Sequence, residues 1–106
     1  GRAPEKELIK TGGENVYPAE VENAILQHPD IADVVVIGVP DPQWSEAIKA
    51  ICVRRTGANV TADELIDFVA GKIARYKKPK HIVFVDQLPR TAKGEIDRAA
   101  VKFDNS

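Results

Sequence analysis

The sequence predicts an α+β domain, in which helices flank a small, mostly antiparallel sheet of about three main strands plus a short N-terminal strand. Short β-branched runs bounded by proline recur along the chain, as is typical of strands. Between them, apolar residues repeat at helical spacing in two segments. The length of 106 residues suits one domain, so residues 1–106 are expected to form a single unit.

The N-terminal third is expected to hold a short strand and a helix. Leu8 and Ile9 precede Gly12 and Gly13, and this order predicts a short strand that ends in a tight loop. Pro18 suits the first turn of the helix that follows, and the sequence HPD at 28–30 ends it. The helix is expected to bury one face and to turn the other to solvent; the buried side would carry Val21, Ala24 and Ile25, and the solvent side Glu20, Glu22 and Asn23.

Two apolar runs in the middle of the chain predict an antiparallel pair of strands. The run ADVVVIGVP at 32–40 is too short for a helix, and the turn sequence DPQW separates it from EAIKAICVRR at 46–55. In the second run, Ile51 and Val53 would face one side of the sheet, while Ile48, Ala50 and Cys52 face the other. Both faces are apolar, which indicates a central strand.

The last third predicts a helix, a strand and a short terminal helix. Thr61 and Glu64 have the spacing of a capping box, and the helix is expected to run until Pro79 ends it, with Lys72 and Arg75 near its C-terminal end. HIVFV at 81–85 predicts a third main strand. DRAAVKF predicts the terminal helix, with Asp97 as its N-cap. The apolar stripe of the first of these helices would consist of Leu65, Ile66, Val69 and Ile73.

Composition narrows the classes of function. The formal net charge of −1 gives no basic field for nucleic acid, and no apolar run approaches the roughly 20 residues of a membrane helix. The single cysteine, Cys52, excludes an internal disulfide and suits a buried position in a protein of the reducing cytoplasm. The abrupt, charged start GRAPEKE leads us to expect a fragment of a longer protein, although processing could also expose Gly1.

Three stretches contain residues that folding alone does not explain, although each stretch by itself fits an ordinary surface loop or turn. They are EKELIKTGGENVYPAE at 5–20, GVPDPQWSEAIKA at 38–50 and LPRTAKGEIDR at 88–98. The segments to compare with known families around them are KELIKTGGENVYPAEVE at 6–22, VVVIGVPDPQWSE at 34–46 and YKKPKHIVFVDQLPRTAKGEIDR at 76–98. In this order and spacing they resemble the C-terminal domain of the adenylate-forming superfamily, which includes acyl-CoA synthetases, luciferases and the adenylation domains of peptide synthetases. The resemblance covers essentially the whole chain.

The resemblance implies an ATP-dependent ligase reaction. A carboxylate attacks the α-phosphate of ATP to give an acyl-adenylate and pyrophosphate, and a thiol such as that of CoA then displaces AMP. Mg²⁺ accompanies the ATP. The larger N-terminal domain, which holds most of the ATP pocket and the acyl pocket, is absent from this sequence, and no phosphate-binding loop motif occurs here. The isolated chain is therefore expected not to turn over ATP.

Lys93 matches the catalytic lysine of the family. Negative charge builds on phosphate oxygens during attack at the α-phosphate, and an ammonium placed there stabilises the transition state. A long side chain on an exposed loop suits delivery by domain closure. Gly94 beside it would let the backbone pass close to the substrate.

The resemblance also assigns nucleotide contacts to the N-terminal region. Arg2 matches an arginine that approaches the ribose, and Lys10 and Asn15 match positions that contact nucleotide in relatives. The hinge between domains falls at Glu5 or Lys6, because the residues APE lengthen the spacer after Arg2; Lys6 is favoured since KELIK then aligns without a gap.

The thioester step is assigned to a different surface. Gly12, Gly13 and Glu14 match the loop that lines the pantetheine tunnel of relatives, where a bulky side chain would block the thiol arm. An aromatic side chain and nearby cations are candidates for the adenine and 3′-phosphate of CoA, although a solvated surface is the favoured explanation for them; these residues are Trp44, Arg54, Arg55, Lys77, Lys78 and Lys80. His28 and His81 lack the spacing of a metal site, so no metal ligands are predicted.

The sequence therefore favours the C-terminal domain of an acyl-CoA synthetase for a fatty acid or a related carboxylate, partnered by its own N-terminal domain, ATP and CoA. Two alternatives stay open. The chain could belong to an adenylation enzyme that loads the phosphopantetheine of a carrier protein, or it could be a non-catalytic interaction domain with the same fold.

Overall fold

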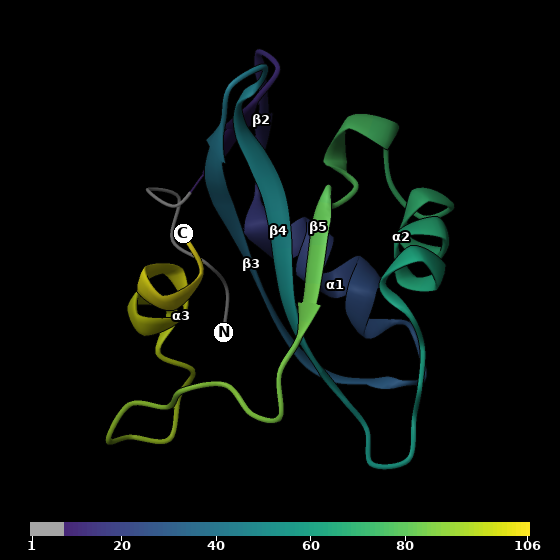
Figure 1. Ribbon diagram of the computed structural model, residues 1–106, viewed down its shortest axis with the longest axis vertical. Coiled ribbons are helices and arrows are strands. Elements are labelled where there is room, and N and C mark those ends of the chain that lie inside the picture. The colour runs from purple at the N-terminus through teal and green to yellow at the C-terminus, as the bar shows by residue number, and fades with distance from the viewer. Residues whose placement is uncertain (1–7) are drawn as a thin grey trace.

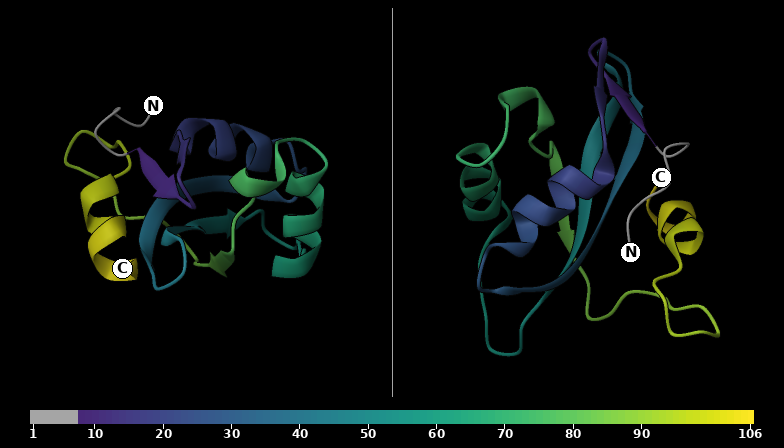
Figure 2. Two further views of the ribbon diagram at one scale, coloured as in Figure 1. Left: turned by 90° about the horizontal axis from the view of Figure 1, so that it is seen from above. Right: turned by 180° about the vertical axis from the view of Figure 1, so that it is seen from behind.

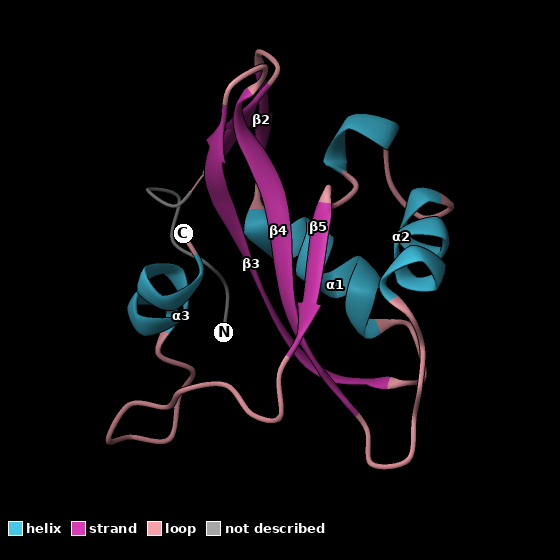
Figure 3. Cartoon of the chain, in the orientation of Figure 1, coloured by secondary structure: helices cyan, strands magenta, loops and turns pink. Residues whose placement is uncertain are grey.

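The computed structural model describes residues 8–106, and this part of the chain forms five strands, three α-helices and one 3₁₀ turn (Figures 1 and 3). The predicted α+β class is confirmed. In chain order the elements are β1 (Ile9–Thr11), β2 (Glu14–Val16), α1 (Pro18–Leu26), β3 (Ile31–Asp41), β4 (Ser45–Arg54), α2 (Ala62–Ala70), the 3₁₀ turn η2 (Arg75–Lys77), β5 (His81–Phe84) and α3 (Arg98–Asn105).

The centre of the sheet is β4, as predicted. It forms a long antiparallel hairpin with β3, whose register runs from Ile31 opposite Arg54 to Asp41 opposite Ser45. On the other edge of β4, β1 pairs antiparallel at Ser45 and β5 pairs parallel along residues 49–52. β5 is the parallel member of an otherwise antiparallel sheet, so the sheet is mostly antiparallel, as expected.

The sheet buries both faces, because helices cover each side (Figure 2). Ile48, Ala50 and Cys52 of β4 pack into a cluster with the apolar sides of α1 and α2. Ile51 faces the opposite way and packs in a second cluster with Val101 of α3. The alternation predicted for β4 is confirmed, and it explains why this strand is apolar on both faces.

The helix α1 begins at Pro18 and ends before the HPD sequence, as predicted. Its solvent side differs from the prediction in one residue. Glu22 is buried at 6% exposure, and its carboxylate accepts a hydrogen bond from the backbone N–H of Val36 and another from Arg98. The helical pattern placed Glu22 with the polar residues, but α3 and the segment before it return from the far end of the chain to cover it.

The helix α2 has the predicted capping box, in which Thr61 Oγ1 accepts from the Glu64 N–H and the Glu64 carboxylate accepts from the Thr61 N–H. The helix ends at Ala70, well before Pro79, so that part of the prediction is wrong. Gly71 follows at the C-cap, where continuing a helix through glycine costs about 1 kcal/mol. As a result Lys72 and Arg75 lie beyond the last helical turn.

The N-terminal segment holds a strand that the sequence reasoning missed. Gly12 and Gly13 are the two loop residues of a β-hairpin between β1 and β2, and both have positive φ, at 57° and 83°. Two consecutive left-handed residues are what a tight hairpin turn requires, and glycine adopts them without a Cβ clash. A Gly-Gly pair between two short segments that each mix polar and apolar residues, here 9–11 and 14–16, is itself a sequence signal for a β-hairpin.

Among the helices of residues 8–106, none has the length and apolar character needed to cross a bilayer.

Candidate functional site

Lys93 lies at the tip of a small hairpin, here called the lysine hairpin, formed by residues 90–96. Arg90 and Ile96 pair across it as an isolated antiparallel bridge. Inside, the N–H of Thr91 donates to the Glu95 carbonyl at 2.7 Å, and the N–H of Gly94 donates to the Thr91 carbonyl at 2.9 Å. Gly94 has a φ of 84°, so this glycine permits the turn itself. The lysine is therefore carried by an ordered loop.

The side chain of Lys93 is exposed to solvent. Its backbone N–H donates to Thr91 Oγ1 at 3.3 Å, and within residues 8–106 its ammonium makes no hydrogen bond or ion pair. A lysine ammonium has three donors. All three are thus available to an anion that approaches from outside this domain.

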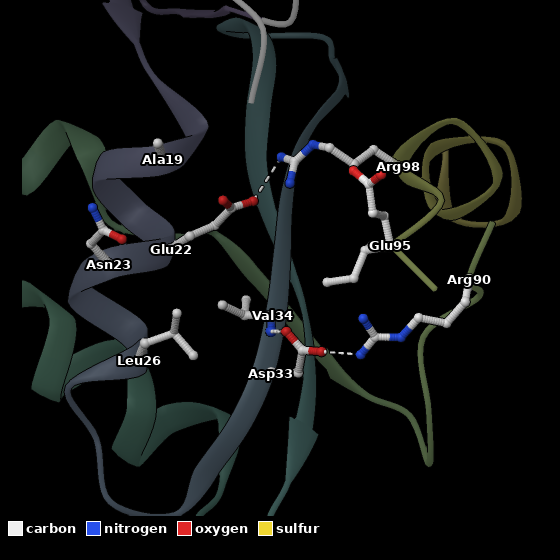
Figure 4. Close-up of a pocket in the computed structure, with 10 residues that line it drawn as sticks. Ala19, Glu22, Asn23, Leu26, Asp33, Val34, Arg90, Glu95 and Arg98 are labelled. Atoms are coloured by element: carbon white, nitrogen blue, oxygen red, sulfur yellow. Dashed lines mark hydrogen bonds and ion pairs between the residues drawn. The ribbon is translucent and has the colours of Figure 1, made fainter. Parts of the chain in front are cut away.

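Two arginine–carboxylate pairs hold the lysine hairpin against α1 and β3 (Figure 4). At its start, Arg90 Nη2 lies 2.8 Å from Asp33 Oδ2, and just after its end Arg98 Nη2 lies 2.7 Å from Glu22 Oε2. Asp97 caps α3 as predicted, because its carboxylate accepts from the Ala100 N–H. A cleft of about 700 Å³ remains between α1, β3 and the hairpin.

Gly12, Gly13 and Glu14, here called the glycine loop, lie at the opposite end of the molecule from the lysine hairpin (Figure 1). The N–H of Gly12 donates to the carbonyl of Trp44 at 2.9 Å, so the β1–β2 turn rests on the β3–β4 turn. Gly12, Gly13 and Glu14 are exposed, and a Cβ added to either glycine would meet no atom within 4 Å. Among residues 8–106, no atom lies close enough to exclude a side chain at Gly12 or Gly13, so only the positive φ angles favour glycine at these two positions.

Lys10 and Asn15 are brought together by the same hairpin, since they are directly opposite each other in its register and both are exposed. The backbone N–H of Lys10 donates to the Glu46 carboxylate at 2.8 Å, which fixes β1 to β4. Arg2 and the hinge residue, whether Glu5 or Lys6, lie outside the described residues.

A cleft of about 260 Å³ joins the glycine loop to Trp44, Lys78 and Lys80. Trp44 is 41% exposed, and the Lys80 ammonium lies 4.9 Å from the centre of its ring, a cation–π distance. Arg75 and Tyr76 also line this cleft and were not among the predicted site residues. Tyr76 adjoins the basic run KKPK, and an aromatic residue beside such a run is the signal that could have identified it.

The other predicted cations have structural partners elsewhere. Arg54 stacks on Phe84 at 4.0 Å and donates to the Val60 carbonyl, and the Arg55 side chain donates to the Pro29 carbonyl. Both lie nine or ten residues along the chain from Ser45, hence roughly 30 Å along β4 from the Trp44 turn. Lys77 is held by two hydrogen bonds to Glu20, which raise its pKa.

The two candidate surfaces are far apart. The lysine hairpin is tied to Asp33 and the glycine loop to the turn after Asp41, which are eight residues apart on β3 and therefore roughly 27 Å apart. In Figure 1 the glycine loop lies at the top, and the lysine hairpin is the yellow-green loop at the lower left.

His28 and His81 do not meet. His28 accepts from the Asp30 N–H and packs edge-on against Phe68, whereas His81 begins β5. In the part of the chain that the structure describes, no three His, Cys, Asp or Glu side chains gather closely enough to hold a metal ion.

The chain matches a family of enzyme domains over most of its length. Residues 20–95 match the AMP-binding enzyme C-terminal domain. Indoleacetate–CoA ligase of Aromatoleum aromaticum is 46% identical over 97 residues, which are 92% of this chain and 19% of that protein. Feruloyl-CoA synthase of an Amycolatopsis species is 44% identical, again over 92% of this chain and 20% of that protein.

Solved structures give the same result. A fatty acyl CoA synthetase of Mycobacterium tuberculosis superposes with a TM-score of 0.89 at 38% identity, covering 95% of this chain and 20% of that protein. ATP-bound MatB from Rhodopseudomonas palustris has a TM-score of 0.89 at 36% identity, covering 93% of this chain and 20% of that protein. The chain spans about a fifth of the relatives that it matches. It belongs to the AMP-binding enzyme C-terminal domain family, within the adenylate-forming superfamily.

Proposed function

We propose that this chain is the C-terminal domain of an AMP-forming acyl-CoA synthetase, an acid–thiol ligase whose ATP and acyl pockets lie on an N-terminal domain outside this sequence. The CoA ligases among its relatives and its coverage of a fifth of their length support this proposal. The observation that carries it is the solvent-exposed Lys93 ammonium at the tip of an ordered hairpin. A fatty acid or a related carboxylate is the proposed substrate.

Lys93 would act in the first half-reaction. A carboxylate oxygen forms a bond to the α-phosphorus of ATP while the bond to pyrophosphate breaks, and negative charge rises on the phosphate oxygens. An ammonium at that point lowers the barrier electrostatically. Because Lys93 makes no ion pair within residues 8–106, no internal contact has to be broken before it reaches the nucleotide. Arg2, Lys6, Lys10 and Asn15 are proposed to contact the nucleotide from the hinge side.

The glycine loop would act in the second half-reaction, in which the CoA thiolate attacks the acyl carbon and AMP leaves. The open space above Gly12 and Gly13 fits a narrow pantetheine arm. Trp44, Lys78 and Lys80, which share one cleft with this loop, suit the adenine ring and phosphates of CoA. Arg54, Arg55 and Lys77 are less suited, because they are engaged elsewhere.

The groups on this chain fit some of the implied ligands and not others. The cations and the aromatic cleft fit the phosphates of ATP and the nucleotide of CoA. The described carboxylates form no cluster for Mg²⁺, so we assign the metal that accompanies ATP to the other domain.

The test uses the full-length enzyme and two separate assays. Pyrophosphate release without CoA, measured over a panel of carboxylic acids, reports acyl-adenylate formation and identifies the acid. Thioester formation from supplied acyl-adenylate reports the second step. Lys93→Ala should lower the first rate roughly 10²–10³-fold and spare the second. Lys102→Ala, an exposed lysine on α3, is the matched control.

Three other results would change the assignment. Equal loss of both half-reactions in Lys93→Ala would contradict the use of two separate surfaces. Unchanged adenylation would favour a non-catalytic domain of the same fold. Thioester formation with a carrier protein but not with CoA would favour the carrier-loading alternative.

A further inference from the structure

One buried carboxylate organises the whole glycine-loop end of the molecule. Asp41, the last residue of β3, is 8% exposed. Its Oδ1 accepts from the backbone N–H groups of Gln43 and Trp44, each at 2.9 Å. Its Oδ2 accepts from the Lys80 ammonium at 2.7 Å. Asp41 therefore joins the β3–β4 turn to a lysine 39 residues further along the chain.

The contacts of Asp41 extend to the glycine loop through Trp44. The Trp44 N–H is held by Asp41, and the Trp44 carbonyl accepts from the N–H of Gly12. The neighbouring pair of Thr11 and Ser45 continues the sheet at this point. Any shift of the β3–β4 turn would thus displace the glycine loop with it.

Asp41 also orients Lys80 and leaves donors on its ammonium available for a second anion. The Lys80 backbone N–H donates to the Ile48 carbonyl at 2.9 Å, and its ammonium lies against both Asp41 and the face of Trp44. The side chain of Lys80 is 42% exposed, and an ammonium that donates once to Asp41 keeps two further donors. A lysine fixed in this way loses less rotamer entropy when it binds a phosphate.

The carboxylate keeps its charge at any neutral pH. The hydrogen bond from Lys80, followed by those from the Trp44 and Gln43 amides, lowers the pKa of Asp41 to about 2. The arrangement is therefore permanent in the working range of a neutral-pH enzyme.

We propose that Asp41 is a positioning residue for the thioester half-reaction: it holds the Trp44 ring, the Lys80 ammonium and the glycine loop in one pre-assembled surface for CoA. This inference rests on the proposed function, because it takes CoA to be the ligand of that surface. It adds a residue that touches neither the nucleotide nor the thiol and acts through Trp44, Lys80 and Gly12.

The test measures both half-reactions of the full-length enzyme in Asp41→Asn. Asparagine keeps an oxygen for the Gln43 and Trp44 amides and loses the charge that holds Lys80, so the turn is preserved. The KM for CoA should rise about tenfold, while pyrophosphate release without CoA stays within about twofold. Asp67→Asn, the same substitution on an exposed face of α2, is the control and should change neither value.

A second variant separates positioning from a general structural effect. Lys80→Met removes the cation that Asp41 orients. If Asp41 acts through Lys80, the double variant Asp41→Asn/Lys80→Met should have the same KM for CoA as Lys80→Met alone. Multiplied losses in the double variant, or loss of adenylation equal to the loss of thioester formation in Asp41→Asn, would overturn the inference.

The same experiment distinguishes the two proposals. If Lys80→Met and Gly13→Leu both leave CoA turnover unchanged, the assignment of this surface to CoA fails, and the inference about Asp41 fails with it. If those variants impair the CoA step and Asp41→Asn does not, the role of Asp41 alone is refuted.

Discussion

Removing one partner of the Glu22–Arg98 ion pair should cost far more stability than removing one partner of the Asp33–Arg90 pair, although both pairs hold the lysine hairpin. The side chains of Glu22 and Arg98 are 8% and 17% exposed, whereas those of Asp33 and Arg90 are 28% and 50% exposed. Removing one partner of a buried pair leaves an uncompensated charge and costs about 3–5 kcal/mol. Exposed pairs contribute about 0–1 kcal/mol.

The perturbation is Arg98→Met, which keeps an apolar stem and removes the guanidinium. The Glu22 carboxylate retains its bond from the Val36 N–H, so we expect the lower end of the range, about 3 kcal/mol. For a domain of this length that corresponds to a fall in Tm of about 12–24 °C. Thermal and urea unfolding of the 106-residue chain, followed by circular dichroism, measure both quantities.

Two further variants test whether burial sets the cost of breaking these ion pairs. Arg90→Met is the matched control and should lower the Tm by no more than a few degrees. Glu22→Gln combined with Arg98→Met replaces the buried pair by neutral groups and keeps a side-chain oxygen for the Val36 N–H, so it should recover most of the lost stability, because no buried charge then remains at position 22. If Arg98→Met costs no more than Arg90→Met, burial does not set the strength of these pairs and the reasoning is wrong.

Cys52, Asp41 and two glycines of positive φ allow further tests of the folded structure. Burial raises the pKa of the Cys52 thiol to about 12, so only about 10⁻⁴ of it is thiolate at pH 8 and a thiol reagent should label the chain in denaturant but not when folded. The pKa of Asp41 is about 2 in the folded chain, against 3.8 for an unperturbed carboxyl, so the ionised Asp41 stabilises the fold fully above about pH 4 and loses this effect as the pH falls towards 2. In urea unfolding, the difference in stability between the wild type and Asp41→Asn should therefore shrink over that pH range. Gly13→Ala and Gly57→Ala should each cost about 1–2 kcal/mol in the same assay, since both glycines have a φ near +84° and open space at the Cβ; a much larger cost at Gly13 would reveal a contact that the glycine loop makes within the chain.

Local patterns predicted the fold where one segment decides its own structure. The Thr61–Glu64 capping box, the Asp97 cap and the alternating faces of β4 depend on neighbouring residues or on one strand, and each is confirmed. The C-terminal end of α2 was wrong because an apolar residue at helical spacing, Ile73, continued the pattern beyond Gly71. Its side chain packs on the core from outside the helix instead.

Ion pairs between residues far apart in the sequence could not be predicted from local patterns. Glu22 and Arg98 are 76 residues apart, and Asp41 and Lys80 are 39 residues apart. A carboxylate on a helix or at a strand end is most often solvated, so neither Glu22 nor Asp41 stands out in the sequence. The same holds for the proposed CoA surface. Trp44 and Lys80 lie together because β5 runs parallel beside β4, whereas Arg54 lies at the other end of β4 and Arg55 directly follows it.

Under the proposed function, the β3–β4 hairpin would allow one small domain to serve both half-reactions. It is buried on both faces, so it behaves as a stiff element that carries the lysine hairpin near Asp33 and the glycine loop near Asp41, roughly 27 Å apart. Side-chain motion cannot bridge that distance, since a lysine side chain reaches only about 6 Å from its Cα. If both surfaces act at one nucleotide site, the whole domain must turn between steps, and each ligand would select its own orientation. A link that locks the domain against its N-terminal partner in one orientation should then abolish one half-reaction and spare the other.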